Sequence, residues 1–135
     1  MNTVTIPATG SFEVKINPLE PFNKDEGSML GRMSIEKTFK GDLEGSGKGE
    51  MLTGGNPQQG SAGYVAMEQV TGTLHGKQGT FLLQHNGSMN RGAPSLTVSV
   101  VPDSGTGELT GISGTLTIKI DAGKHFYEFD YSLPE

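Results

Sequence analysis

The chain has 135 residues, no cysteine and a formal net charge of −5. This length predicts one domain that buries about two-thirds of the surface its unfolded chain exposes. The lack of cysteine excludes disulfides, thiolate metal ligands and cysteine nucleophiles, and the dispersed, mildly acidic charge argues against a nucleic-acid partner.

The first residues lack the basic start and the apolar run of a signal peptide. No apolar stretch approaches the ~20 residues that cross a bilayer as a helix. We therefore expect a cytoplasmic protein with no membrane partner.

Alternation of apolar and polar residues, which is typical of half-buried strands, dominates the first half of the chain. Residues 1–8 are expected to form a flexible N-terminus, and residues 9–135 a single domain. Strands are predicted over residues 11–16 and 33–40, separated by a loop over 17–27 that is rich in Pro, Asn and Gly. Residues 41–53 are expected to be a glycine-rich strand pair or one bent strand, with a turn over 54–57.

The second half continues the same pattern. Strands are predicted over residues 64–74, 81–85, 96–100, 116–120 and 125–133. A loop is expected over 90–94, a turn over 102–105 and a short hairpin loop over 121–123.

A spaced glycine pattern, Gly-x-Leu-x-Gly-x-x-Gly-x-apolar, occurs at residues 72–81 and again at 107–116, with a looser copy at 41–51. It predicts repeated β-hairpins. About eight strands with one apolar face each favour an all-β fold, a single antiparallel eight-stranded β-barrel, because closure removes the exposed edges of a sheet. A two-sheet β-sandwich is the alternative.

Several segments together resemble a bacterial family catalogued as a domain of unknown function, family 3224. They are Phe39–Gly45, Gly49–Leu52, Gly60–Ala66, Val70–Gly76, Gln84–His85 and Val101–Leu109. The resemblance covers residues 8 to 133 and implies a barrel similar to that of allene oxide cyclase. It implies no established activity, and no catalytic residue of that plant enzyme is matched to a position here.

Lys37, Glu68 and His85 stand out because alternation places each among apolar neighbours on an inward face. A buried charge is costly without a partner, so Lys37 and Glu68 are predicted to form an ion pair. One hypothesis is structural: an ion pair at a barrel end, with His85 bonded to the backbone. The other is functional: Glu68 or His85 acts as a general base, and Lys37 holds an anionic group.

Tyr64 and Tyr127 are candidates to line an apolar pocket, and Arg91 is a candidate to guard its mouth for an acidic ligand. A filled core and a solvated loop arginine are the simpler interpretations. The three histidines are His75, His85 and His125, and they show no metal-ligand spacing. We expect no metal and no cofactor.

Two functions from different classes follow. The first is binding of a small, partly apolar and perhaps anionic ligand in the barrel. The second is a small isomerase or cyclase. A weaker third hypothesis is a homodimeric aspartic protease using Asp103 of the Asp-Ser-Gly-Thr segment, since such enzymes need two aspartates sharing a proton. If the barrel self-associates, a homodimer is expected.

Overall fold

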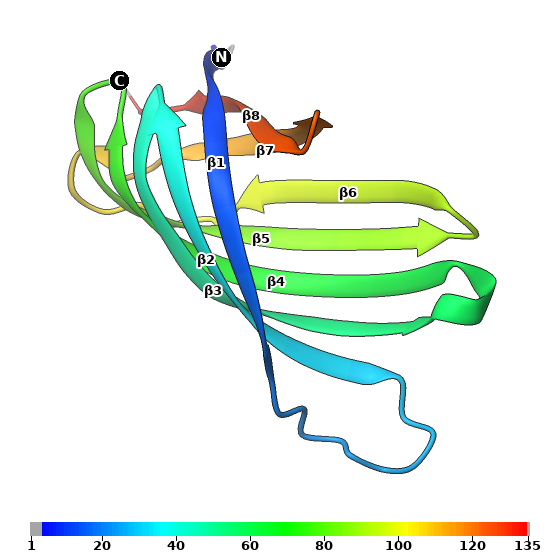
Figure 1. Ribbon diagram of the computed structural model, residues 1–135. Coiled ribbons are helices and arrows are strands. Elements are labelled where there is room, and N and C mark those ends of the chain that lie inside the picture. The colour runs from blue at the N-terminus through cyan, green and yellow to red at the C-terminus, as the bar shows by residue number, and fades with distance from the viewer. Residues whose placement is uncertain (1–3, 135) are drawn as a thin grey trace.

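The computed structural model describes residues 4–134, and they form one closed barrel of antiparallel strands (Figure 1). The strands follow one another around the barrel in chain order. They are β1 (Ile6–Leu19), β2 (Leu30–Gly41), β3 (Leu43–Asn56), β4 (Ser61–Leu74), β5 (Lys77–Asn90), β6 (Ala93–Val100), β7 (Ser113–Asp121) and β8 (Lys124–Ser132). Two short 3-10 turns, η1 (Pro57–Gln59) and η2 (Gly107–Leu109), lie between strands.

The last strand returns to the first, and this pairing closes the sheet. β1 and β8 pair from Ile6 with Tyr131 to Phe12 with His125. The predicted eight-stranded antiparallel barrel is therefore confirmed, and the alternative of two stacked sheets is wrong.

The start of the chain is more ordered than the sequence suggested. Residues 1–3 of the expected flexible segment lie outside the described residues. Ile6, Pro7 and Ala8 instead belong to β1, where they pair with β8. Ala8 is fully buried, so pairing and burial hold a segment whose composition carries little strand signal.

Several strands run further than alternation predicted, because ladder pairing continues through glycine and proline positions. β3 is one strand, in which Gly54 and Gly55 still pair with β4. Only residues 91 and 92 separate β5 from β6, so the expected loop over 90–94 is a tight turn. In the copy of the glycine pattern at residues 107–116, Gly107 to Leu109 form η2 and not a strand end.

The leucines of the three glycine-pattern copies meet the core at one end of the barrel. Leu43, Leu74 and Leu109 are all fully buried. Phe81 and Phe129 stack beside them with ring centroids 5.6 Å apart. We call this the closed end.

The opposite end is incomplete, because the last three strands are short. β6, β7 and β8 have 8, 9 and 9 residues, whereas β1, β3, β4 and β5 have 14 each. β8 leaves β1 after Phe12, and β6 pairs with β7 only through Ser99 and Thr115. Figure 1 shows β3, β4 and β5 extending past the tip of the β7–β8 hairpin. We call this the open end.

No helix within residues 4–134 has the length and apolar character needed to cross a membrane.

Replacing a leucine at the closed end should cost far more stability than replacing one on the outer face of the same strand. We expect Leu43→Ala to lower the free energy of unfolding by about 2–5 kcal/mol, because it removes buried methyl groups and leaves a cavity. Leu52→Ala is the matched control, since Leu52 is 57% exposed on β3. It should change stability by less than about 0.5 kcal/mol. Urea denaturation measures both, and equal losses would contradict the assigned facing of β3.

Candidate functional site

Three charged or titratable side chains lie inside the barrel where the closed end meets the open end. Lys37 comes from β2, Glu68 from β4 and His85 from β5. Each occupies an inward position of its strand, and each has a buried apolar residue two places away. Their exposed fractions are 7%, 1% and 4%. We call these three residues the polar cluster.

One carboxylate oxygen organises the polar cluster. Glu68 Oε1 accepts a hydrogen bond from Lys37 Nζ at 2.9 Å and lies 2.7 Å from His85 Nε2. The predicted ion pair between Lys37 and Glu68 is confirmed. The imidazole of His85 contacts Glu68 and not the backbone, so that part of the structural hypothesis is wrong.

The residues that surround the polar cluster explain how the charges of Lys37 and Glu68 are accommodated inside the barrel. The ammonium of Lys37 lies 4.9 Å from the centroid of the Phe12 ring and 5.9 Å from that of Phe39, within the range of a cation–π contact. Gly47 of β3 leaves room for the carboxylate, because a Cβ there would come within 2.3 Å of Glu68 Oε2. Among the described residues, Oε2 is buried without a hydrogen-bond partner.

Burial alone raises the pKa of the Glu68 carboxyl. The hydrogen bond from His85, together with the charge and hydrogen bond of Lys37, outweighs burial, so the pKa lies below its ordinary value of 4.5. Glu68 is therefore ionised at neutral pH and balances the charge of Lys37. Because Glu68 already neutralises Lys37, the polar cluster offers no uncompensated positive charge to an anionic group.

The other predicted site residues are dispersed. The ring of Tyr64 lies over Gly87 on the inner face of β4 and β5, on the open side of the polar cluster, and burial raises its pKa. Tyr127 lies at the closed end, where its hydroxyl donates to the carbonyl of Lys40 at 3.0 Å and accepts from the amide of Leu43 at 2.9 Å. Arg91 is exposed on the β5–β6 turn.

Asp103 lies on an exposed turn with a positive φ of 61°. The next residue, Ser104, ties this turn down: its Oγ donates to the carbonyl of Val101 at 2.7 Å and accepts from the amide of Leu82 at 3.0 Å. This geometry supports a structural role for Asp103 and Ser104 in forming the turn. The protease hypothesis rests on a dimer that brings two such carboxylates together, and it stays a prediction.

A second cluster of titratable side chains lies at the closed end and was not predicted from the sequence. It consists of Asp42, His75 and Tyr131. The Nδ1 of His75 contacts the hydroxyl of Tyr131, and its Nε2 lies 3.5 Å from Asp42 Oδ2. Asp42 also accepts the amide of Thr9 at 2.9 Å. The one available signal was position, since Asp42 and His75 each adjoin the leucine of a glycine-pattern copy. Within residues 4–134, no group of three His, Asp or Glu side chains has the arrangement of a metal site.

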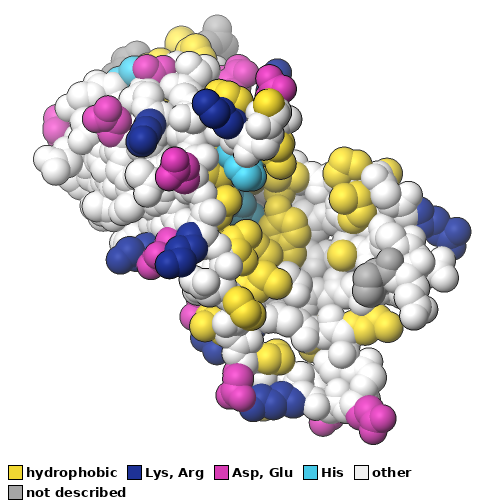
Figure 2. Space-filling model, in the orientation of Figure 1, with side chains coloured by type: hydrophobic (Ala, Val, Ile, Leu, Met, Phe, Trp, Pro, Cys, Tyr) yellow, Lys and Arg dark blue, Asp and Glu magenta, His cyan; other side chains and the backbone are white. Residues whose placement is uncertain are grey.

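The open end leaves apolar inward-facing side chains uncovered. Ile16, Leu96 and Ile120 are 46%, 42% and 67% exposed, although they continue the rows of buried residues on their strands. Figure 2 shows hydrophobic side chains gathered in a hollow between the part of the molecule that holds β7 and β8 and the long strands. We call this the open-end hollow; the polar cluster lies at its inner limit.

Removing the charge of Glu68 should strongly destabilise the barrel. We expect Glu68→Gln to lower the free energy of unfolding by about 3–5 kcal/mol, because Lys37 then stays buried without its counter-charge. Adding Lys37→Met should recover part of this loss. Thermal and urea denaturation measure the effect.

The matched control is Glu50→Gln, which breaks the exposed pair between Glu50 and Arg32. It should change stability little, because exposed pairs are screened by water. A loss after Glu68→Gln no larger than after Glu50→Gln would contradict the role assigned to the polar cluster.

Acid should abolish the contribution of Glu68. Its pKa is lower in the folded chain than in the unfolded chain, so its stabilisation is present above about pH 4.5 and is lost as pH falls through the folded value. The stability difference between the wild type and Glu68→Gln should therefore shrink between pH 5 and pH 3. Denaturation at a series of pH values measures it, and a constant difference would refute the assignment.

Comparison with known proteins agrees with the fold. The sequence matches the family described as "Protein of unknown function (DUF3224)" over residues 8–131. No curated protein matches. A solved structure from Shewanella oneidensis MR-1, a protein of unknown function from the DUF3224 family, is 48% identical. The similarity covers 97% of this chain and 98% of that one, with a TM-score of 0.91. The chain therefore belongs to the DUF3224 family.

Proposed function

We propose that the open-end hollow binds a small, partly apolar molecule. The observation that carries this proposal is the exposure of Ile16, Leu96 and Ile120 on faces that elsewhere form the core. Burying such side chains against a ligand is favourable by about 25 cal/mol for each Å² of apolar surface. An apolar concave surface with a few polar groups nearby is the usual form of a small-molecule site.

The preference of the open-end hollow for a charged ligand depends on exposed residues at its mouth and not on the polar cluster. Lys37 is already neutralised by Glu68 at 2.9 Å. Arg91 is exposed on the β5–β6 turn at the open end and presents a positively charged guanidinium to solvent. An acidic group on the ligand would therefore be expected to meet Arg91 while the apolar part enters the hollow.

The geometry favours binding over catalysis. A general base should have a pKa near the working pH, whereas the pKa of Glu68 is lowered. Its free oxygen lies against Gly47 and is buried. An isomerase or cyclase activity, like the resemblance to allene oxide cyclase, thus rests on analogy of fold, which is no evidence for chemistry.

Two fluorescent probes test the proposal. N-phenyl-1-naphthylamine is uncharged, and anilinonaphthalene sulfonate carries one negative charge. We expect both to bind with enhanced fluorescence, because the apolar hollow excludes water from them. Arg91→Gln should weaken only the sulfonate.

Leu96→Gln should weaken both probes several-fold, since Leu96 faces the hollow. Leu52→Gln is the control, because Leu52 has comparable exposure on the outer face of β3. Equal effects of the two substitutions, or no binding of either probe, would refute the proposal.

A further inference from the structure

The edge of β1 at the open end has backbone groups without a strand partner. β1 pairs with β8 only from Ile6 to Phe12 and continues beside β2 as far as Leu19. No other strand in residues 4–134 pairs with the remaining edge. Its polar backbone groups therefore face away from the sheet.

Strand alternation identifies the residues of β1 whose backbone groups lack a strand partner. The carbonyl of Thr9 accepts from the amide of Asp42, and its amide donates to the Asp42 side chain, so Thr9 bonds toward β2. Alternate residues of a strand bond to opposite neighbours, and the register with β2 runs without a break. Val14 and Ile16 thus point their N–H and C=O groups to the open side. Pro18 ends this edge, because proline has no N–H to donate.

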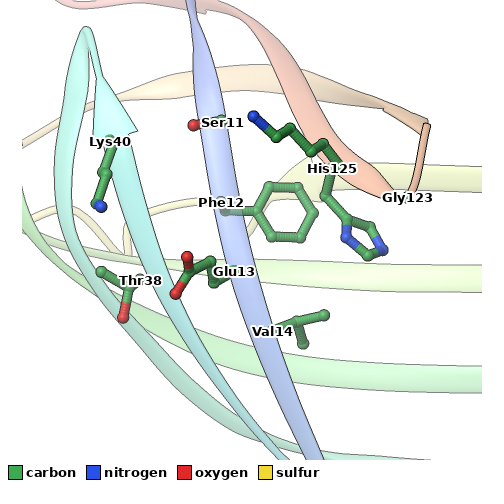
Figure 3. Close-up of a pocket in the computed structure, with 9 residues that line it drawn as sticks. Ser11, Phe12, Glu13, Val14, Thr38, Lys40, Gly123 and His125 are labelled. Carbon is green, nitrogen blue, oxygen red and sulfur yellow. The ribbon is translucent and has the colours of Figure 1, made fainter. Parts of the chain in front are cut away.

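A pocket lies at the head of this edge, where β8 begins. It has a volume of about 480 Å³ and is lined by residues of β1, β2, the β7–β8 turn and the start of β8. The exposed amines of Lys40 and Lys124 border it. Figure 3 shows the ring of Phe12 beside the imidazole of His125, with Val14 further along β1. The centroids of these two rings are 5.1 Å apart.

We propose that this edge binds the C-terminal segment of an extended polypeptide, which adds a strand to β1 and places its terminal carboxylate between Lys40 and Lys124. Strand addition to an exposed sheet edge is a common mode of peptide recognition, in which backbone hydrogen bonds give affinity. The two lysines supply a charge complementary to a carboxylate, and Val14 and Ile16 supply the backbone partners. This inference rests on the backbone edge of β1 and on the two lysines, neither of which carries the small-molecule proposal.

The direction of the added strand follows from β8. A peptide antiparallel to β1 and in line with β8 runs toward the first residue of β8, Lys124. It therefore reaches the pocket with its C-terminus and not with its N-terminus. Every second side chain then faces the open-end hollow beside Ile16, so an apolar last residue and apolar residues at alternate positions are favoured.

The charge of the site favours a peptide end over a second copy of the chain. Two β1 edges paired symmetrically would bring no terminal carboxylate to the pocket, where lysines outnumber acidic residues. The one acidic residue that lines the pocket is Glu13. Its side chain lies on the outer face of the sheet, as do those of Lys40 and Lys124, so two lysines against one glutamate leave the pocket an excess of positive charge.

Fluorescence anisotropy with a labelled peptide tests the proposal. The probe is a heptapeptide of alternating valine and threonine, ending in valine and labelled at its N-terminus. It is compared as the free acid and as the C-terminal amide. We expect the free acid to bind at least fivefold more tightly, because only it carries the carboxylate.

Two variants separate the charge from the edge. Lys124→Gln should remove most of the preference for the free acid, while Lys77→Gln, at an exposed lysine of the closed end, should not. Ile16→Pro removes one edge N–H without touching the β2 pairing and should weaken the acid and the amide alike. Ile16→Val keeps the N–H and should bind normally. Thermal denaturation of each variant confirms that it is folded.

Equal affinity for acid and amide in the wild type would overturn the proposal, as would retention of the acid preference in Lys124→Gln. Analytical ultracentrifugation of the protein without peptide tests the alternative that a second copy of the chain binds the edge. A concentration-dependent dimer that Ile16→Pro abolishes would assign the edge to a second copy of the chain.

Discussion

The unequal length of the strands is the constraint on which the rest of this structure depends. A barrel abolishes sheet edges only where every strand has two neighbours. Here β8, with nine residues, pairs with β1 over only half of the fourteen residues of β1. One end therefore closes over a conventional core, while the other keeps its inner face and one strand edge in contact with solvent.

The polar cluster lies at the boundary between the closed end and the open end. Lys37 and Glu68 are nearly fully buried, so close and well-oriented partners must offset the hydration that they lose. At the boundary, Lys37 meets the faces of two phenylalanine rings and shares one oxygen of Glu68 with His85. Gly47 provides the space that the carboxylate occupies. The cluster thus joins three strands, β2, β4 and β5, by hydrogen bonds that only the folded barrel can form, and Gly47 of β3 leaves room for them.

Much of this arrangement could be predicted from the sequence, because alternation reports which face of a strand a residue occupies. It placed Lys37, Glu68 and His85 on inward faces and so predicted the ion pair. Strand length was harder to predict, since pairing through Gly54 and Gly55 depends on the neighbouring strand and not on propensity. The contact of His75 with Tyr131 and Asp42 was not predictable. It joins the β4–β5 turn to β8 and to the β2–β3 turn, and which residues of these segments meet depends on the stagger of the strands in the closed barrel.

Amide hydrogen exchange followed by NMR tests the half-closed barrel most directly. The amides of Ala8 and Gly10 point to β8 and should be strongly protected, whereas those of Val14 and Ile16 lie beyond its first residue and should exchange at rates near those of an unpaired strand. Such a change in protection along the even-numbered residues of one strand is the predicted result. Protection of Val14 and Ile16 equal to that of Gly10 would contradict this account, because it would mean that the open edge is covered.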